Sequence, residues 1–225
     1  MAASPPDVAE IGVSRMRGDA RREQLIRVAI ELFSRKGFSG TTTKEIANAA
    51  GVTEALIFRH FPTKEALYDA ILLWRVETGR FSEGYVEMQE RAEARDDVGL
   101  FRAVLRGMLD FHRENVDFLR LMFFAKLEGH ELGETFRERH IKPSHEFLER
   151  YVAMRQTEGA FRAVDPSTVV GAILGMAFFH SMNSNIFRCR EHAPSDEETV
   201  ESFIRIALDG LRLPMTSSDP TKDTL

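Results

Sequence analysis

Apolar and polar positions recur at helical spacing in two short segments between residues 42 and 61. Thr42 followed by Glu45 is the pattern of a capping box, so we expect a helix to begin here. Gly51 suits a sharp turn, because a left-handed backbone conformation costs glycine little. Thr53 is in position to cap a second helix, which should end before Pro62. The inward-facing positions are expected to be Ile46, Ala47, Ala50, Ile57 and Phe61. Two short helices joined in this way form a helix-turn-helix, which predicts recognition of DNA.

Helical periodicity continues on both sides of this pair. Residues 20–36 place apolar side chains on one face and end at Gly37, a suitable helix C-cap. A further helix is expected after Thr63, with an apolar stripe made of Ala66, Leu67, Ala70, Ile71 and Trp74. Later helices are expected near residues 85–94, 98–114, 116–128, 133–158, 166–189 and 196–211. No segment shows the sustained alternation that is typical of strands, so we expect an all-α fold.

Four regions are expected along the chain. Residues 1–18 carry two adjacent prolines and no apolar periodicity, which indicates a flexible arm. Residues 19–63 form a three-helix helix-turn-helix head, residues 64–213 a larger helical body, and residues 214–225 a flexible polar tail.

The charge distribution also singles out the head. The 225-residue chain has a formal net charge of −5, which is unusual for a DNA-binding protein. Between residues 15 and 65, however, ten Lys and Arg face six Asp and Glu, so this segment carries about +4. A basic module on an acidic body fits a local phosphate-binding face.

Other classes of protein are less well supported by the residues. No Ser/His/Asp arrangement, phosphate-binding loop or carboxylate pair stands out, so we assign no catalytic residue and expect no enzyme, cofactor or metal. His140 and His145 are separated by Pro143, which is poor geometry for a metal site on one helix.

The longest nearly apolar run, residues 169–179, is shorter than the roughly 20 residues that span a bilayer. No signal peptide is found, and the single Cys189 fits a reducing compartment, so we expect a cytoplasmic protein. Its neighbours Arg188 and Arg190 leave a redox-sensing role for Cys189 open.

The head resembles the TetR/AcrR family of bacterial transcriptional regulators. The resemblance rests on the first helix and on the run GFSGTTTKEIANAAGVTEALIFRHFPTKEALYDAI, which together cover about 60 residues with caps, turn and core in register. It implies that Thr42 and Lys64 hold backbone phosphates, and that Thr43 and Lys44 reach phosphate or a base edge. The recognition helix would contribute Thr53, Glu54, Ala55, Phe58, Arg59 and His60. Phe58 stands where many members have Tyr, which removes one hydroxyl for phosphate, and Ala55 replaces a common Gly.

The resemblance also implies a homodimer that binds a palindromic operator in double-stranded DNA, and a body that binds a small apolar or amphipathic effector. The candidate effector-binding residues are Phe101, Met108, Phe111, Met122, Phe123, His145, Phe178 and Met182, with His112, Lys126 and Asn183 as further polar candidates. Gly171 and Gly175 permit close approach of helices. With Phe178, and with Phe203, Ile206, Ala207 and Leu211 from the last helix, they are the candidate dimer interface. Packing within the chain is the alternative for both sets.

The leading hypothesis is a repressor that its effector releases from DNA by moving the helix after Thr63. A regulator controlled by a protein partner instead of a small molecule is the nearest alternative. A helical enzyme or scaffold with a vestigial head is a more distant one. Operator, effector and regulated genes are not given by the sequence.

Overall fold

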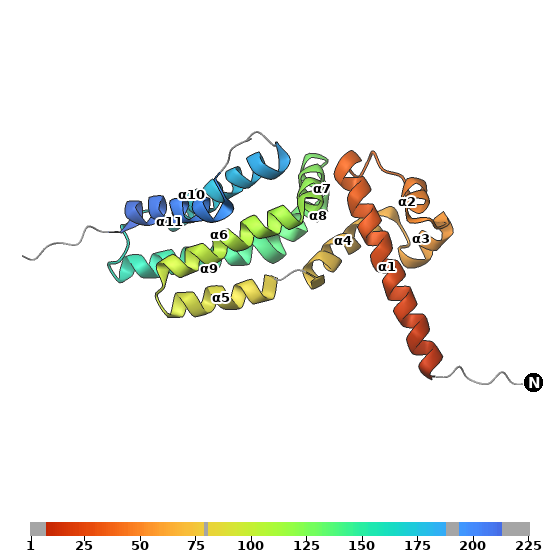
Figure 1. Ribbon diagram of the computed structural model, residues 1–225, viewed down its shortest axis with the longest axis horizontal. Coiled ribbons are helices and arrows are strands. Elements are labelled where there is room, and N and C mark those ends of the chain that lie inside the picture. Colours follow the sequence, from red (N-terminus) through yellow and green to blue (C-terminus); the bar gives the residue numbers. More distant parts are fainter. Residues whose placement is uncertain (1–7, 79–80, 188–193, 213–225) are drawn as a thin grey trace, which may run out of the picture. The chain divides into compact units, whose positions relative to one another are not determined.

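The structure, a computed structural model, describes residues 8–78, 81–187 and 194–212. Within these ranges the regular elements are helices, which confirms the all-α prediction, and one isolated antiparallel bridge pairs Phe161 with Arg212. In chain order the elements are α1 (Val8–Lys36), α2 (Thr43–Ala50), α3 (Glu54–His60), α4 (Lys64–Thr78), α5 (Phe81–Glu93), α6 (Asp97–Glu114), α7 (Val116–Leu127), α8 (Glu131–Phe136), the π-helical turn η1 (Arg137–Ile141), α9 (Lys142–Thr157), α10 (Pro166–Ser181), the π-helical turn η2 (Met182–Ile186) and α11 (Asp196–Leu211) (Figure 1).

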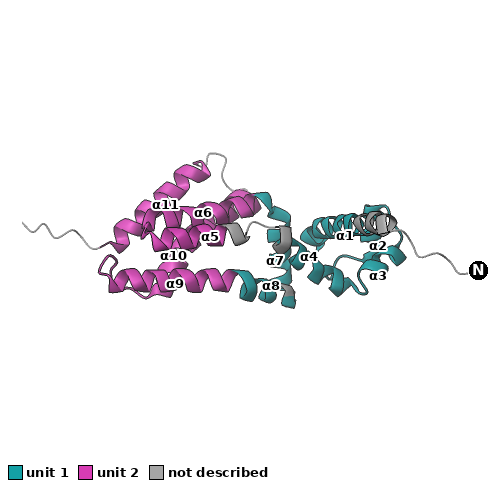
Figure 2. Cartoon of the chain, turned by 90° about the horizontal axis from the view of Figure 1, so that it is seen from below, with its two compact units in different colours: residues 1–81, 114–140 teal, residues 82–113, 141–225 magenta. Residues whose placement is uncertain are grey.

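The chain divides by packing into two compact units, drawn in different colours in Figure 2. Unit 1 comprises Met1–Phe81 and Glu114–His140, and unit 2 comprises Ser82–Arg113 and Ile141–Leu225. Packing does not say which residues bind DNA or an effector. The boundary between head and body after residue 63 therefore stays a prediction, as does the tail from residue 214, which lies outside the described residues.

The head forms the first part of unit 1. Helix α1 begins at Val8 rather than near Ala20, so it extends into the segment that we expected to be an arm. Helices α2 and α3 pack together, and α1 lies against both α2 and α4 (Figure 1). Leu25, Ile26 and Phe33 of α1 are fully buried. The expected inward-facing residues of α2 and α3 are buried as well: Ile46, Ala47, Ala50, Ile57 and Phe61.

Helices α4, α7 and α8 complete unit 1. Helix α7 packs along α1, and α8 packs against α7 and α4. The buried face of α4 includes Leu67, Ala70 and Ile71, as expected, and also Tyr68, whose ring is fully buried. The Tyr68 ring contacts the rings of Phe33, Phe38 and His130, with ring centres 4.9, 4.9 and 4.5 Å away.

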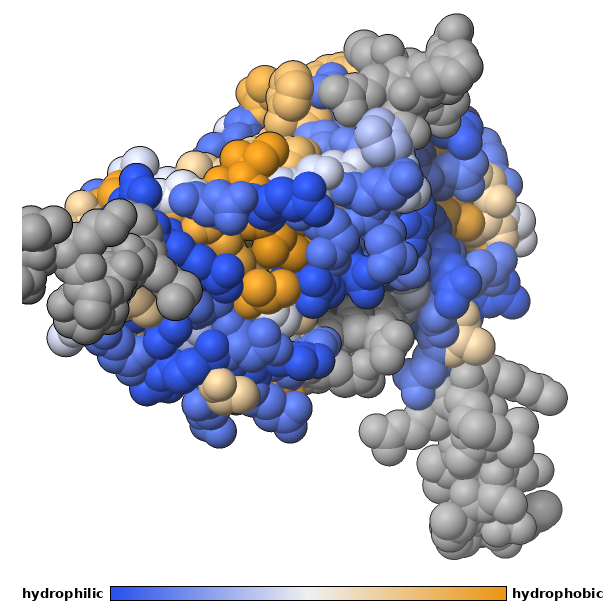
Figure 3. Space-filling model, turned by 60° about the vertical axis from the view of Figure 1, so that its left-hand side comes forward, coloured by the Kyte–Doolittle hydropathy of each residue, from blue (hydrophilic) through white to orange (hydrophobic). Residues whose placement is uncertain are grey.

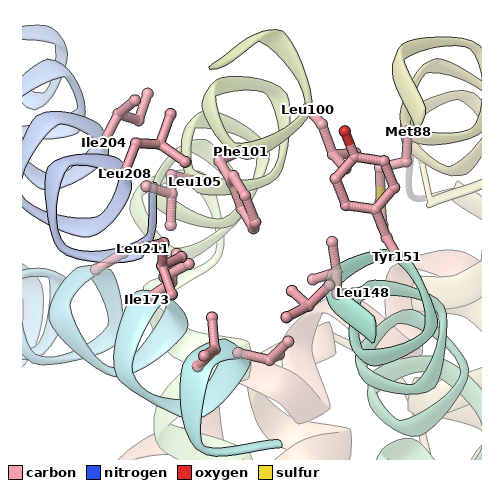
Figure 4. Packing of buried hydrophobic residues seen from close by; sticks show 14 of the residues in the cluster. Met88, Leu100, Phe101, Leu105, Leu148, Tyr151, Ile173, Ile204, Leu208 and Leu211 are labelled. Carbon is pink, nitrogen blue, oxygen red and sulfur yellow. The ribbon is translucent and has the colours of Figure 1, made fainter. Parts of the chain in front are cut away.

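Unit 2 is built around a hydrophobic core to which α5, α6, α9, α10 and α11 contribute. Figure 4 shows Phe101 and Leu105 of α6 pointing into the core, with Leu208 of α11 and Ile173 of α10 on one side and Leu148 and Tyr151 of α9 on the other. Because these residues come from four helices, burying them fixes the packing of the whole unit.

Ion pairs join α6 to α11 along the side of this core. Arg102 makes two hydrogen bonds with Glu201, at 2.6 and 2.8 Å. Arg106 pairs with Glu197, and Arg113 Nη1 lies 2.6 Å from Asp196. The pairs run in opposite order on the two helices, as antiparallel packing requires. Each pair is partly exposed and adds little alone, so the ladder specifies register more than it adds stability.

A buried network links the start of α6 to α9. The Asp97 carboxylate accepts hydrogen bonds from the Tyr151 hydroxyl at 2.6 Å and from Arg155 at 2.9 and 3.1 Å. The hydrogen bond to Asp97 raises the pKa of Arg155, and burial raises the pKa of Tyr151. Because every charge in this network has a partner, it avoids the cost of an isolated buried charge.

Helix α10 and η2 form the most apolar part of unit 2. Together they span Pro166–Ile186, which by length and composition is long and apolar enough to cross a membrane, with 39% of the most apolar stretch buried. The run at residues 169–179, which we judged too short to span a bilayer, is therefore part of a longer apolar helix. Its ends and contacts fit a helix in a bundle: Asp165 caps its start, and α9 and α11 pack against it.

Candidate nucleic-acid interface

The start of α2 is held by the predicted capping box. Glu45 N donates to Thr42 Oγ1 at 3.2 Å, and Thr42 N donates to Glu45 Oε2 at 2.9 Å. The Lys36 ammonium lies 2.6 Å from Glu45 Oε1. The hydrogen bond from Lys36 and those from Thr42 lower the pKa of Glu45 to about 2. The exposed Thr42 and Lys44 are thereby set at the first turn of α2, where helix N-terminal amides favour phosphate.

The turn between α2 and α3 has the predicted geometry. Gly51 is left-handed, with φ 67° and ψ 35°, and ends α2. Thr53 stands at the N-cap position of α3, but its side chain makes no capping hydrogen bond, contrary to our expectation. Instead, the Thr43 hydroxyl donates to the Glu54 carboxylate and joins the two helices across the turn. The Glu54 carboxylate is therefore engaged within the head.

One face of α3 is open to solvent. Ile57 is fully buried, whereas Ala55, Phe58 and Arg59 are exposed. Phe58 is 44% exposed, so a large aromatic ring lies among the polar groups of this face. A solvent-facing surface that includes the exposed cation Arg59 therefore lies where recognition was expected, and its contact with DNA stays a prediction.

His60 lies partly inside the head. Its Nε2 atom is buried and has no hydrogen-bond partner among the described residues. Burial, followed by the nearby charges of Arg59, Arg22 and Arg21, lowers the pKa of His60. The imidazole is therefore neutral near pH 7, and its contact with phosphate or sugar stays a prediction.

Lys64 is held at the edge of the head by the loop before α2. Its ammonium donates to the Phe38 carbonyl oxygen and lies 4.1 Å from the centre of the Phe38 ring. Burial lowers the pKa of Lys64, while Glu65, Glu128 and Glu45 act in the opposite direction. The phosphate contact predicted for Lys64 is untested, and the ammonium already has two partners within unit 1.

Sequence analysis missed Glu128, which contacts the same loop from the end of α7. Its carboxylate accepts from Phe38 N at 2.9 Å and from Ser39 N at 3.3 Å. The partners are 90 and 89 residues apart, so no local pattern indicated the contact. The one local signal is Gly129, which follows Glu128 with φ +71° and marks the end of α7.

The predicted effector-binding residues are divided between the two units. Unit 2 contains Phe101, Met108, Phe111, His145, Phe178 and Met182, and unit 1 contains Met122 and Phe123. Phe101 and Met182 are buried, and Phe101 belongs to the hydrophobic core of unit 2. Phe178 is 41% exposed and meets the His112 ring edge-on, with 5.9 Å between ring centres. The further polar candidates Lys126 and Asn183 are exposed and partly buried, respectively.

His112 is the buried polar group among these candidates. Its Nδ1 lies 2.9 Å from Ser181 Oγ, which also accepts from Asn185 Nδ2 at 3.1 Å. Burial lowers the pKa of His112 to about 4. The imidazole is therefore neutral near pH 7, when it can donate or accept a hydrogen bond but carries no charge.

The predicted dimer residues differ in exposure. Gly171, Gly175, Phe178 and Ile206 are exposed, and a Cβ added at either glycine meets no described atom within 4 Å. Phe203 and Ala207 are partly buried against the core. Leu211 is 7% exposed and belongs to that core, so packing within the chain already explains its burial.

The redox role of Cys189 and the possibility of a metal site were also considered from the sequence. Cys189 lies outside the described residues. Among the described residues, no group of three or more His, Cys, Asp or Glu is placed to hold a metal ion.

Comparisons with known proteins agree with this geometry. Residues 25–71 match the family model described as "Bacterial regulatory proteins, tetR family". The nucleoid occlusion factor SlmA of Actinobacillus pleuropneumoniae serotype 5b is 32% identical over 113 residues, which are 50% of this chain and 52% of that protein. The chain therefore spans about half the length of the relatives that it matches at this level. The transcriptional regulator RutR of Escherichia coli K12 is 24% identical over 203 residues, covering 86% of this chain and 91% of RutR.

A solved structure shares the fold. AibR, in complex with isovaleryl coenzyme A and operator DNA, has a TM-score of 0.60 and 21% identity, and the match covers 83% of this chain and 97% of AibR. The likeness to AibR shows that the helix-turn-helix and the helices after it share one fold with that protein. In residues 25–71 the chain is therefore similar to the TetR family of bacterial regulatory proteins. RutR is named as a transcriptional regulator and SlmA as a nucleoid occlusion factor, which supports the prediction that this chain is not an enzyme.

Proposed function

We propose that this protein is a cytoplasmic, dimeric transcriptional repressor that binds a palindromic operator through α2 and α3 and leaves it when a small apolar effector binds. The observation that carries the DNA-binding part is the geometry of the head: a capped α2, a left-handed Gly51 and a solvent-facing surface on α3 with Arg59 exposed. A helix presented in this way fits the major groove.

Arg59→Ala tests the recognition surface. We expect the affinity for duplex DNA from upstream of the gene to fall by about 1–3 kcal/mol, because a bidentate contact between Arg and guanine contributes that much discrimination. Fluorescence anisotropy at fixed salt measures the dissociation constant. The control is Arg150→Ala, which removes the same charge from an exposed position on α9. Equal affinities for the two variants would contradict the assignment of Arg59.

The homodimer rests on the open face of α10 and α11. Gly171, Ala172, Gly175 and Phe179 lie exposed along α10, and Phe179 is 65% exposed. On α11, Ile206 is 62% exposed. Figure 3 shows hydrophobic residues gathered on one face of the molecule with hydrophilic residues around them. Small residues beside exposed aromatic rings suit close packing of a second copy, and an isologous interface joins like surfaces.

Ile206→Glu tests the dimer interface. We expect the mass in solution to fall from twice 25.6 kDa to 25.6 kDa, because a charge on each copy would be buried against the other. Size-exclusion chromatography with light scattering measures the mass. Val86→Glu is the control, because Val86 is 52% exposed on α5 and outside the proposed interface. A dimer that survives Ile206→Glu would place the interface elsewhere.

The effector part is supported by unit 2 and by a relative. Met108 and Phe111 near the end of α6 are partly exposed apolar groups, the exposed Phe178 of α10 contacts the His112 ring, and the neutral His112 supplies one buried polar group there. AibR, which shares the fold, binds isovaleryl coenzyme A together with operator DNA. We therefore propose an apolar effector that bears an uncharged hydrogen-bonding group, held near His112. Such a ligand shifts the dimer between two states only by its difference in affinity for them.

A thermal-shift screen of hydrophobic compounds tests for the effector. A compound present at about 100 times its Kd stabilises the folded state by about 2.7 kcal/mol. We expect such a compound to raise the melting temperature by several degrees. His112→Gln should reduce this shift for compounds with a hydrogen-bonding group and leave DNA affinity without ligand unchanged. If no compound shifts the melting temperature while DNA binding is intact, control by a protein partner becomes the better explanation.

A further inference from the structure

The loop between α1 and α2 determines where α2 begins. It runs from Gly37, which has φ +72°, to the N-cap residue Thr42. Thr41 is fully buried, and its hydroxyl donates to the Gly37 carbonyl oxygen at 2.9 Å. Any movement of this loop therefore moves Thr42 and the first turn of α2, which are the proposed phosphate contacts.

The backbone amides in the middle of this loop are held by a side chain from outside the head. Phe38 N and Ser39 N both donate to the Glu128 carboxylate, at 2.9 and 3.3 Å. A carboxylate that accepts two backbone N–H groups makes charge-assisted hydrogen bonds, which are stronger than neutral ones. A Cβ added at Gly37 would lie 2.6 Å from Glu128 Oε1 and would displace the carboxylate, and the φ of +72° independently favours glycine here.

The groups around this contact keep the loop in one orientation. The Phe38 ring packs against both Tyr68 and His130, with ring centres 4.9 and 5.0 Å away. His130 and Tyr68 are themselves 4.5 Å apart. On the same ring, the Lys64 ammonium lies 4.1 Å from the centre and donates to the Phe38 carbonyl oxygen. The loop is thus fixed through the amide, the ring and the carbonyl of one residue.

We propose that Glu128 is a positioning residue for DNA binding: it holds the α1–α2 loop in the conformation that presents Thr42, Thr43 and Lys44 to the phosphate backbone. Glu128 touches no DNA in this account and acts through the loop amides. The proposal rests on the proposed function of the head. It assigns the turn between α7 and α8, residues 128–130, to DNA binding.

Electrostatics alone predicts the opposite effect of losing Glu128. The chain has a net charge of −5, and removing a carboxylate near a DNA-binding surface strengthens attraction to phosphate. Positioning predicts weaker binding after the same change, because the loop loses its two charge-assisted hydrogen bonds. The sign of the change in affinity therefore separates the two explanations.

The experiment compares Glu128→Gln, Glu128→Asp and Glu131→Gln in the full-length protein, with duplex DNA from upstream of the gene as the probe. Glu128→Gln keeps the shape and removes the charge, whereas Glu128→Asp keeps the charge and withdraws the carboxylate by one methylene. Glu131→Gln is the control, because Glu131 is exposed on the first turn of α8 and loses the same charge. We expect affinity to fall about tenfold for both Glu128 variants and to stay equal or rise for Glu131→Gln.

Two further measurements separate positioning from a general loss of stability. Hydrogen exchange should become faster at the amides of Phe38 and Ser39 in both Glu128 variants, at a temperature where circular dichroism shows the protein folded. The slope of log K against log salt should flatten by up to about one unit in both Glu128 variants, because a displaced loop weakens the phosphate contact proposed for Lys44. A steeper slope would show that the carboxylate acts on DNA through its charge alone, which would contradict positioning.

The outcomes distinguish this proposal from the proposed function. If the wild-type protein does not bind DNA, the proposed function is wrong, and the role proposed for Glu128 is wrong as well. If the wild type binds and both Glu128 variants bind equally well or better, the positioning role is overturned while DNA binding stands. Unchanged exchange at Phe38 and Ser39 in both variants overturns it as well.

Discussion

Two helices as short as α2 and α3, with eight and seven residues, are not stable alone in water, because so few hydrogen bonds do not offset the cost of nucleating a helix. Their geometry depends on the surface on which they pack. Ile46 and Ile57 are fully buried against the rest of unit 1, and the loop before α2 is fixed at Phe38. The proposed DNA-binding surface of α3 therefore depends on contacts from α1, α4 and the turn between α7 and α8.

The helices of unit 2 have one buried face and one exposed face. The buried faces of α6, α9, α10 and α11 form one core, and ion pairs such as Arg102–Glu201 set the register of α6 and α11. The outer face of α10 keeps Gly175 and Phe179 exposed. A core that is complete within one chain, beside an apolar face that is left open, fits a unit that folds in a monomer and then pairs with a second copy.

Local patterns were predictable from the sequence, and contacts between distant segments were not. The capping box at Thr42 and the turn at Gly51 depend on residues within three or four positions, and both are present. Tyr68 escaped the predicted stripe of α4 because its partners are Phe38 and His130, on other segments. The exposure of Gly171 and Gly175 could not be predicted from the sequence either, because a Gly-x-x-x-Gly pattern permits close packing within or between chains.

The central claim is that α2 and α3 of two copies read one symmetric DNA site. Selection from a random duplex library by the wild-type protein, followed by sequencing of the bound fraction, tests it most directly. The account predicts enrichment of a palindrome whose half-sites lie about 34–36 Å apart along the helix axis, or a multiple of one turn. Enrichment of a single asymmetric half-site would contradict the dimeric part of the account. A bound fraction with no enriched sequence would contradict specific reading by the head.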